Sequence, residues 1–208
     1  MSALDNLHEI AMGLRKPDDR PERLRQMPSA MDSTALYYRF LYELARNWKP
    51  NLQVEIGTFV GSSCAHMAMG HPGGVVVTID MDFEATRIAG SLDLPNLWPI
   101  HSASALAVKQ IGCLRDIDIL FIDGNHCFNN CYGEYVLYRP LVRQGGIILF
   151  DDIDLDAQMK TAWKYILDEK RSLPSLHYTG FGACVVNHEI DVPSWDEVAP
   201  KAALEFKA

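Results

Sequence analysis

The segments ILFIDGNH (119–126) and GIILFDD (146–152) are apolar runs that end in acidic residues, and Asp123 precedes Asp151 by 28 positions. That spacing has room for one helix between two parallel strands, which indicates an open α/β sheet. Such a sheet presents its chemistry at the carboxyl ends of its strands. We therefore expect Asp123, Asp151 and Asp152 to lie in one crevice, where three carboxylates would suit a hard cation such as Mg²⁺ or Mn²⁺.

A third segment, LQVEIGTFVGSS (52–63), predicts a short strand, a glycine loop and the start of a helix. Gly57 and Gly61 are four positions apart, and Ser62 follows directly. Glycines let the backbone approach a ligand closely, and the first N–H groups of the following helix point toward it. A plain turn is the alternative interpretation of this loop taken alone.

The next apolar run, VVVTID (75–80), ends in Asp80, which lies 23 positions after Gly57. An acidic residue at that distance reaches the two hydroxyls of a bound ribose. The glycine loop, the spacing and the acidic strand end together indicate a cofactor that carries a nucleoside.

Composition agrees with one α/β unit outside the membrane. The chain has 208 residues, of which 48% are hydrophobic, and no apolar run approaches the ~20 residues of a membrane span. The N-terminal stretch does not resemble a secretion signal, so we expect a cytoplasmic protein. A net charge of −8 argues against nucleic acid as a partner. The five scattered cysteines are expected to be free thiols.

Apolar periodicity predicts alternating strands and helices. The expected strands are 52–56, 75–80, 97–101, 118–122 and 146–150, and the expected helices are 62–70, 83–92, 104–112, 127–142 and 157–169. An amphipathic helix should follow Ser33 as its N-cap, and a hairpin should form within LHYTGFGACVVNHE (176–189). We divide the chain into an N-terminal arm with a short helix (1–32), the main domain (33–190) and a C-terminal extension (191–208). The arm is rich in arginine and proline, and on that basis we expect a homo-oligomer.

Several motifs together carry a resemblance to a known group: EIGTFVGSS (55–63), TID (78–80), SAS (102–104), and the DGNH and FDD strand ends. Over about residues 33–188 the chain resembles class I S-adenosylmethionine-dependent methyltransferases. Within them it is most similar to metal-dependent O-methyltransferases, both the catechol O-methyltransferase-like proteins and the sugar- and antibiotic-tailoring enzymes related to cephalosporin hydroxylase. The resemblance implies a Rossmann-like fold with helices on both faces of a seven-stranded, mostly parallel sheet whose last strand is antiparallel.

The resemblance also implies roles for individual residues. Glu55 and Gly57, with Gly61 and Ser62 in the same loop, would lie at the methionine part of S-adenosylmethionine. Asp80 would hold the ribose, and Ser104, or its neighbour Ala103 through the backbone, would lie at the adenine.

At the metal, the resemblance implies Asp123, Asp151 and Asp152 as ligands. The chain departs from the catechol enzymes in having Asp152 where they have asparagine, and His126 where they have a lysine base. The tailoring enzymes also carry histidine in this setting, so the departures point away from a catechol substrate.

The expected chemistry follows from the nucleophile. A protonated hydroxyl is a poor nucleophile, and a cation held by Asp123, Asp151 and Asp152 would lower its pKa. His126 could accept the proton near neutral pH. Structural alternatives to these catalytic roles stay open. His126 could cap a helix or orient a metal ligand, and the Asp151–Asp152 pair could be solvated. Aromatic residues belong to a hydrophobic core more often than they line a substrate site. The aromatic residues in question are Tyr37, Tyr38, Phe40, Tyr42, Tyr132 and Tyr135. The histidines at 66, 71, 101, 177 and 188 are given no role.

Three functions compete at this point. The first is an O-methyltransferase acting on a small hydroxylated molecule such as a sugar, a glycoside or a natural-product diol or phenol. The second is a nicotinamide-dependent oxidoreductase, which the G-x-x-x-G spacing after a glutamate disfavours. The third is a non-catalytic cofactor-binding or assembly protein, which would not need three carboxylates.

Overall fold

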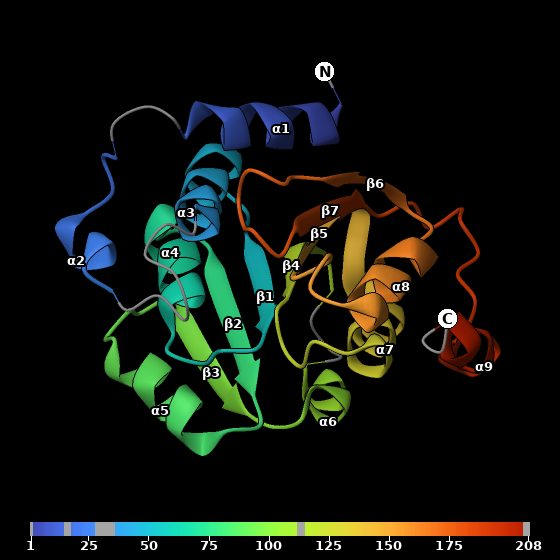
Figure 1. The fold of residues 1–208 in the computed structure, drawn as a ribbon. Coiled ribbons are helices and arrows are strands. Elements are labelled where there is room, and N and C mark those ends of the chain that lie inside the picture. Colours follow the sequence, from blue (N-terminus) through green and yellow to red (C-terminus); the bar gives the residue numbers. More distant parts are fainter. Residues whose placement is uncertain (1, 15–17, 28–35, 112–114, 206–208) are drawn as a thin grey trace.

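One sheet of seven strands, in the order β3-β2-β1-β4-β5-β7-β6, forms the centre of the molecule (Figure 1). The computed structural model describes residues 2–14, 18–27, 36–111 and 115–205. The strands are β1 (Leu52–Ile56), β2 (Val75–Asp80), β3 (Leu97–His101), β4 (Ile117–Ile122), β5 (Val142–Asp151), β6 (Glu169–Ser172) and β7 (Phe181–Val185). β1 to β5 pair in parallel, and β7 runs antiparallel to both β5 and β6. The expected fold class is confirmed.

Helices cover both faces of the sheet. They are α1 (Ala3–Gly13), α2 (Glu22–Arg25), α3 (Tyr37–Trp48), α4 (Ser62–Gly70), α5 (Phe83–Ser91), α6 (Ser104–Gln110), α7 (Phe128–Tyr138), the short 3₁₀ helix η1 (Arg139–Leu141), α8 (Ala157–Tyr165) and α9 (Trp195–Glu205). One core cluster joins the sheet to α7 and α8, and a second joins its other face to α1, α3 and α4. None of the helices in the described ranges is long and apolar enough to cross a membrane.

The continuous apolar runs in the sequence follow from this covering on both faces. In β2, Val77 and Ile79 pack in the first core cluster, whereas Val76 packs in the second. In β4, Leu120 and Phe121 point in the same way to opposite clusters. A strand that is buried on both faces needs apolar residues at every position, because successive side chains alternate between the faces.

The expected helix over 157–169 is wrong in its last part. α8 ends at Tyr165, and Glu169 begins β6, so the hairpin partner of β7 lies earlier in the chain than 176–180. One long-range pair and two local contacts explain the difference. Arg139 Nε donates to Asp168 Oδ2 at 2.6 Å. Lys170 Nζ donates to the carbonyl oxygens of Lys164 (3.1 Å) and Ile166 (2.7 Å) at the helix end. The charged residues of β6 suit the edge of the sheet, where one side of the strand is exposed.

The expected helix over 127–142 also ends early, at Tyr138, and β5 begins at Val142. Pro140 lies in the intervening 3₁₀ turn. A proline has no backbone N–H to continue an α-helix, which accounts for the break.

The two ends of the chain pack on the central domain. Ser33, the expected N-cap, lies outside the described residues, and α3 begins at Tyr37. In the arm, Leu24 is buried against Tyr42 and Ala65 of the same chain. At the other end, α9 contributes to the core. The domain boundaries and the homo-oligomer stay predictions. The cysteines within the described ranges, at 64, 127, 131 and 184, are free thiols, and Cys113 lies outside those ranges.

Candidate active site

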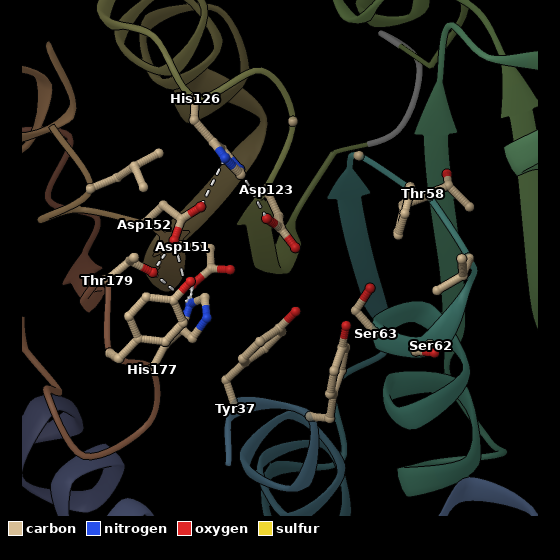
Figure 2. Close-up of a pocket in the computed structure, with 17 residues that line it drawn as sticks. Tyr37, Thr58, Ser62, Ser63, Asp123, His126, Asp151, Asp152, His177 and Thr179 are labelled. Atoms are coloured by element: carbon tan, nitrogen blue, oxygen red, sulfur yellow. Dashed lines mark hydrogen bonds and ion pairs between the residues drawn. The ribbon is translucent and has the colours of Figure 1, made fainter. Parts of the chain in front are cut away.

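The carboxyl ends of the parallel strands meet at one edge of the sheet, and a cavity of about 330 Å³ opens there. The predicted site residues that line it are Gly57, Ser62, Asp123, His126, Asp151 and Asp152. Figure 2 shows the acidic and histidine side chains on one side of the cavity and Thr58, Ser62 and Ser63 on the other. Glu55, Gly61, Asp80 and Ser104 are not among the lining residues.

The glycine loop begins where β1 passes the end of β4. Gly57 has φ +99° and donates its N–H to the carbonyl oxygen of Ile79 at 2.9 Å. A Cβ on Gly57 would lie 2.0 Å from the carbonyl oxygen of Asp123. Gly61, at φ +75°, is the N-cap of α4. Glycine at position 57 is therefore required by the close approach of two loops, whatever ligand the loop also holds.

Asp80 ties this loop to the end of β2. Its Oδ2 accepts the backbone N–H groups of Thr58 (2.8 Å) and Phe59 (3.1 Å), and its Oδ1 accepts that of Asp82 (2.8 Å). A carboxylate offers about four acceptor positions, so one remains for a further donor. The ribose role of Asp80 stays a prediction, and a structural role stands beside it.

Glu55 and Ser104 do not line the cavity, and each has a partner of its own. Glu55 is fully buried, its Oε2 accepts from Thr78 Oγ1 at 2.5 Å, and burial raises its pKa to about 7. Ser104 Oγ donates to Glu134 Oε1 at 2.7 Å. Burial likewise raises the pKa of Glu134 to about 7. The side chains of Glu55 and Ser104 therefore serve buried hydrogen bonds in this structure.

His126 lies between two of the expected metal ligands. Its Nε2 is 3.3 Å from Asp123 Oδ1 and its Nδ1 is 2.8 Å from Asp152 Oδ2. Hydrogen bonds to Asp123 and Asp152 raise the pKa of His126 to about 10, so the ring is an imidazolium at neutral pH in this arrangement. The imidazole bridges the two carboxylates.

His177 completes the cluster, although it was given no role from the sequence. Its Nδ1 lies 2.9 Å from Asp151 Oδ1, and Thr179 Oγ1 donates to Asp152 Oδ1 (Figure 2). The antiparallel pairing of β7 with β5, in which Asp151 faces Phe181, brings this segment to the acidic edge. The sequence predicted a hairpin in this region, but His177 could have been assigned to the site only if the register of β7 against β5 had been known.

Backbone conformation also marks this corner. Asp152 has φ +57°, in the left-handed region that few residues other than glycine, asparagine and aspartate adopt. Burial would raise the pKa of Asp152, but hydrogen bonds from His126 and Thr179 outweigh that effect and lower it. Its carboxylate is therefore ionised and held in a fixed direction.

All six of the aromatic residues named from the sequence are buried, and two of them also line the cavity. Tyr37 and Tyr38 line the cavity. The core holds Phe40, Tyr42, Tyr132 and Tyr135.

The donor set fits a divalent cation. One ligand atom from each of Asp151, Asp152 and His177 lies within 4.8 Å of the others. Burial, and then the charge of Asp151, raises the pKa of Asp123, and burial also raises the pKa of Asp151. A cation beside such buried carboxylates would offset the cost of their charge. Asp123 is joined to this group through His126.

Comparisons with known proteins bear on the family and the fold. Residues 54–153 match a family model described as a methyltransferase domain. An uncharacterized protein of Acanthamoeba polyphaga mimivirus is 28% identical over 130 residues, a match that covers 56% of this chain and 59% of that protein. The chain thus spans less than two thirds of that relative.

Solved structures share the fold. An O-methyltransferase from Bacillus cereus, in complex with SAH, has a TM-score of 0.67 at 23% identity, with 89% of this chain and 98% of that chain covered. The O-methyltransferase TomG from Streptomyces achromogenes, in complex with SAM, has a TM-score of 0.61 at 19% identity, with 90% of this chain and 100% of that chain covered. Residues 54–153 thus match the model of a methyltransferase domain, and the chain shares the Rossmann-like fold of the solved methyltransferase structures.

Proposed function

We propose that this protein is an S-adenosylmethionine-dependent O-methyltransferase that requires a divalent cation and acts on a hydroxyl of a small molecule. One observation carries the proposal. The cavity has the glycine loop of β1 on one side and three carboxylates with two imidazoles on the other. Cofactor loop and acid–base cluster thus face the same space.

The cofactor would lie along the carboxyl edge of β1 and β2. The structures of the Bacillus cereus and Streptomyces achromogenes enzymes contain SAH and SAM, respectively, which supports the same cofactor here. Gly57, Gly61 and Ser62 would surround its methionine part, with Glu55 beneath the loop. Asp80 would accept the ribose hydroxyls, and Ser104 would mark the adenine end. Because the cofactor carries the reactive methyl group, the protein's part is to position and activate the acceptor.

Asp123, Asp151 and Asp152 would hold the cation. A bound dication would lower the pKa of the acceptor hydroxyl and orient its oxygen. His126 would then take the proton at a ring nitrogen. It can do so only in the neutral form, which requires the charges of Asp123 and Asp152 to be compensated, because hydrogen bonds to those two carboxylates raise the pKa of the ring.

The lining suggests the class of acceptor. Tyr37, Tyr38 and Tyr178 line the cavity, next to the charged cluster. A sugar, a glycoside or a natural-product diol or phenol would place a ring against those side chains and its hydroxyls at the carboxylates. Magnesium or manganese would serve as the cation, and the net charge of −8 does not suit a nucleic acid as substrate.

The proposal is tested by binding and turnover together. Calorimetry should show that SAH binds and NAD does not. Transfer of a labelled methyl group from S-adenosylmethionine to a panel of diols, glycosides and phenols should stop after chelation and return with Mg²⁺ or Mn²⁺. Asp123→Asn should reduce transfer, whereas Asp196→Asn, at an exposed position of α9, should not.

Three outcomes would overturn all or part of the proposal. Binding of NAD in place of SAH would favour the oxidoreductase. Full transfer after exhaustive chelation would reject the cation. Binding of SAH with no transfer to any acceptor of the panel, with or without cation, would favour a non-catalytic cofactor-binding protein.

A further inference from the structure

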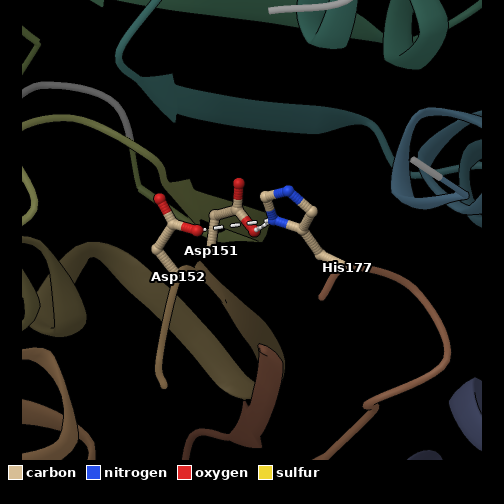
Figure 3. Close-up of side chains that lie close together, drawn as sticks. All are labelled: Asp151, Asp152 and His177. Carbon is tan, nitrogen blue, oxygen red and sulfur yellow. Dashed lines mark hydrogen bonds and ion pairs between the residues drawn. The ribbon is translucent and has the colours of Figure 1, made fainter. Parts of the chain in front are cut away.

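The side chains of His177, Asp151 and Asp152 lie close enough together to bind one cation (Figure 3). His177 Nδ1 lies 2.9 Å from Asp151 Oδ1 and 3.4 Å from Asp152 Oδ1. The side chain is 11% exposed, and its ring packs against Tyr37 and Tyr178 at centroid distances of 5.3 Å and 4.9 Å. The imidazole therefore has little freedom to point elsewhere.

These separations match neighbouring positions around one cation. Two ligand atoms that each lie about 2.1 Å from an octahedral cation, at right angles, are about 3 Å apart. The distances from Nδ1 to the two carboxylate oxygens lie close to that value. A hydrogen bond between His177 and Asp151 would have a similar length. Distance alone allows both, so the surroundings must decide between them.

The turn that carries His177 is fixed to the segment that carries the carboxylates. Asp154 donates its N–H to the carbonyl oxygen of Thr179 at 2.8 Å. Gly180, at φ +88°, packs so closely that a Cβ there would lie 2.7 Å from Asp154 Oδ2. The nitrogen and the two carboxylates are therefore held together by the backbone, independently of the hydrogen bond between their side chains. A prearranged set of ligands is what a metal site needs.

We propose that His177 supplies an imidazole nitrogen to the cation held by Asp151 and Asp152, and that the site thereby prefers a first-row transition dication to Mg²⁺. This inference rests on the proposed cation dependence and specifies the metal. Mg²⁺ takes oxygen ligands, whereas imidazole suits the transition dications, whose affinity for a given site rises from Mn²⁺ through Fe²⁺ and Co²⁺. Mn²⁺ is the natural probe because it accepts both ligand types and is paramagnetic.

The experiment is Mn²⁺ binding to the metal-free full chain, followed by electron paramagnetic resonance without cofactor or acceptor. Pulsed spectra of the wild type should show a coupled ¹⁴N nucleus, and Mn²⁺ should bind at least tenfold more tightly than Mg²⁺. In His177→Gln the nitrogen coupling should disappear and the Mn²⁺ affinity should fall about 10- to 100-fold, with a much smaller change for Mg²⁺. Asp151→Asn should lower the affinity for both Mn²⁺ and Mg²⁺.

His126→Gln is the matched control, because His126 also touches Asp152. Nitrogen coupling that survives in His126→Gln supports His177 as the ligand. Coupling that is lost in His126→Gln and kept in His177→Gln overturns the inference, as does a wild type without coupling. Thr179→Val, which removes a donor to Asp152 and keeps the imidazole, should retain the coupling and shows whether changes in this turn disturb the fold.

The outcome is separable from the proposed function. Nitrogen coupling in a protein that transfers no methyl group would keep the metal site and reject the transferase. Methyl transfer that depends on Mg²⁺ and is unchanged in His177→Gln would keep the transferase and reject His177 as a ligand.

Discussion

Asp80 contributes to loop structure and, as proposed, to cofactor binding, and two substitutions separate these contributions. Asp80→Ala removes the acceptor of the Thr58 and Phe59 N–H groups as well as the expected ribose partner. It should weaken SAH binding by about 1.5 to 3 kcal/mol, roughly ten- to a hundredfold. Asp80→Asn keeps one acceptor oxygen for the loop, so its free energy of unfolding should be close to that of the wild type. Calorimetry with urea unfolding checks both, and unchanged SAH affinity in Asp80→Ala would remove Asp80 from the ribose site.

Glu55 makes stability depend on pH. Its pKa is raised to about 7 by burial, from an ordinary value of 4.5, so the folded state holds a proton that the unfolded state has lost between these values. Folding stability should therefore fall as pH rises from about 4.5 to about 7, by as much as about 3 kcal/mol. In Glu55→Gln this loss is absent. Urea unfolding of both proteins at pH 5 and pH 8 should show the variant gaining on the wild type at pH 8. Parallel behaviour would mean that Glu55 stays ionised when buried.

His126 is tested by the pH dependence of the rate. If it accepts the proton, His126→Gln should lower methyl transfer by ~10²- to 10⁴-fold with little effect on SAH binding. The neutral ring is the base, so the wild-type rate should rise with pH through the titration of an imidazole, and the inflection should vanish in the variant. A variant that keeps both rate and inflection would leave His126 as a residue that only orients Asp123 and Asp152.

The sequence contains much of the site but not its last member. Asp123, Asp151 and Asp152 could be placed together because each ends an apolar strand and parallel strands share an edge. His177 could not, because its position depends on the register of β7 against β5, with Phe181 opposite Asp151. Nor could the placement of His126 between two carboxylates be derived, since it depends on side-chain geometry.

At the scale of elements, β1, α4, β2 and β3 have the bounds expected from the sequence. Gly57 follows β1, Gly70 ends α4 and Asp80 ends β2, and the apolar run of β2 matches a strand buried on both faces. The expectation fails at β6, where a charged segment with helical periodicity forms an edge strand. Two contacts stop α8: Asp168 makes a long-range pair with Arg139 at 2.6 Å, and Lys170 makes a local contact with the carbonyl oxygen of Ile166 at the helix end. The local sequence pattern around α8 does not reveal a partner as distant in the chain as Arg139.

The contact between α3 and α4 gives a prediction at this scale. A Cβ on Gly70 would lie 2.5 Å from the carbonyl oxygen of Tyr42 and 2.8 Å from Ala45 Cβ. Gly70→Ala should therefore force the helices apart and lower the free energy of unfolding by about 1 to 3 kcal/mol. Gly13→Ala is the control, because nothing lies within 4 Å of a Cβ there, and it should be neutral or slightly stabilising. Equal urea midpoints for the two variants would contradict close packing of the two helices.

At the scale of the whole molecule, the question is whether the C-terminal segment 191–208 belongs to the folded domain. Val198 and Ala202 of α9 lie in the first core cluster, and Tyr132 donates to the carbonyl oxygen of Pro193 at 2.8 Å. A chain ending at residue 190 should lose at least about 2 kcal/mol of unfolding free energy, because a buried valine alone contributes about that much. Urea unfolding of the truncated chain checks this. Unchanged stability would show that 191–208 is an appendage to the rest of the chain.

The left-handed backbone at Asp152 bears on how such a protein can evolve. At φ +57° the residues accommodated without strain are glycine, asparagine and aspartate, so the backbone restricts what mutation can usefully supply. A single nucleotide change converts an aspartate codon to asparagine, which preserves the conformation and an oxygen ligand and removes one negative charge. The charge of the site is thus adjustable in one step without remodelling the chain. Drift at this position should move descendants between metals and acceptors while the fold stays constant.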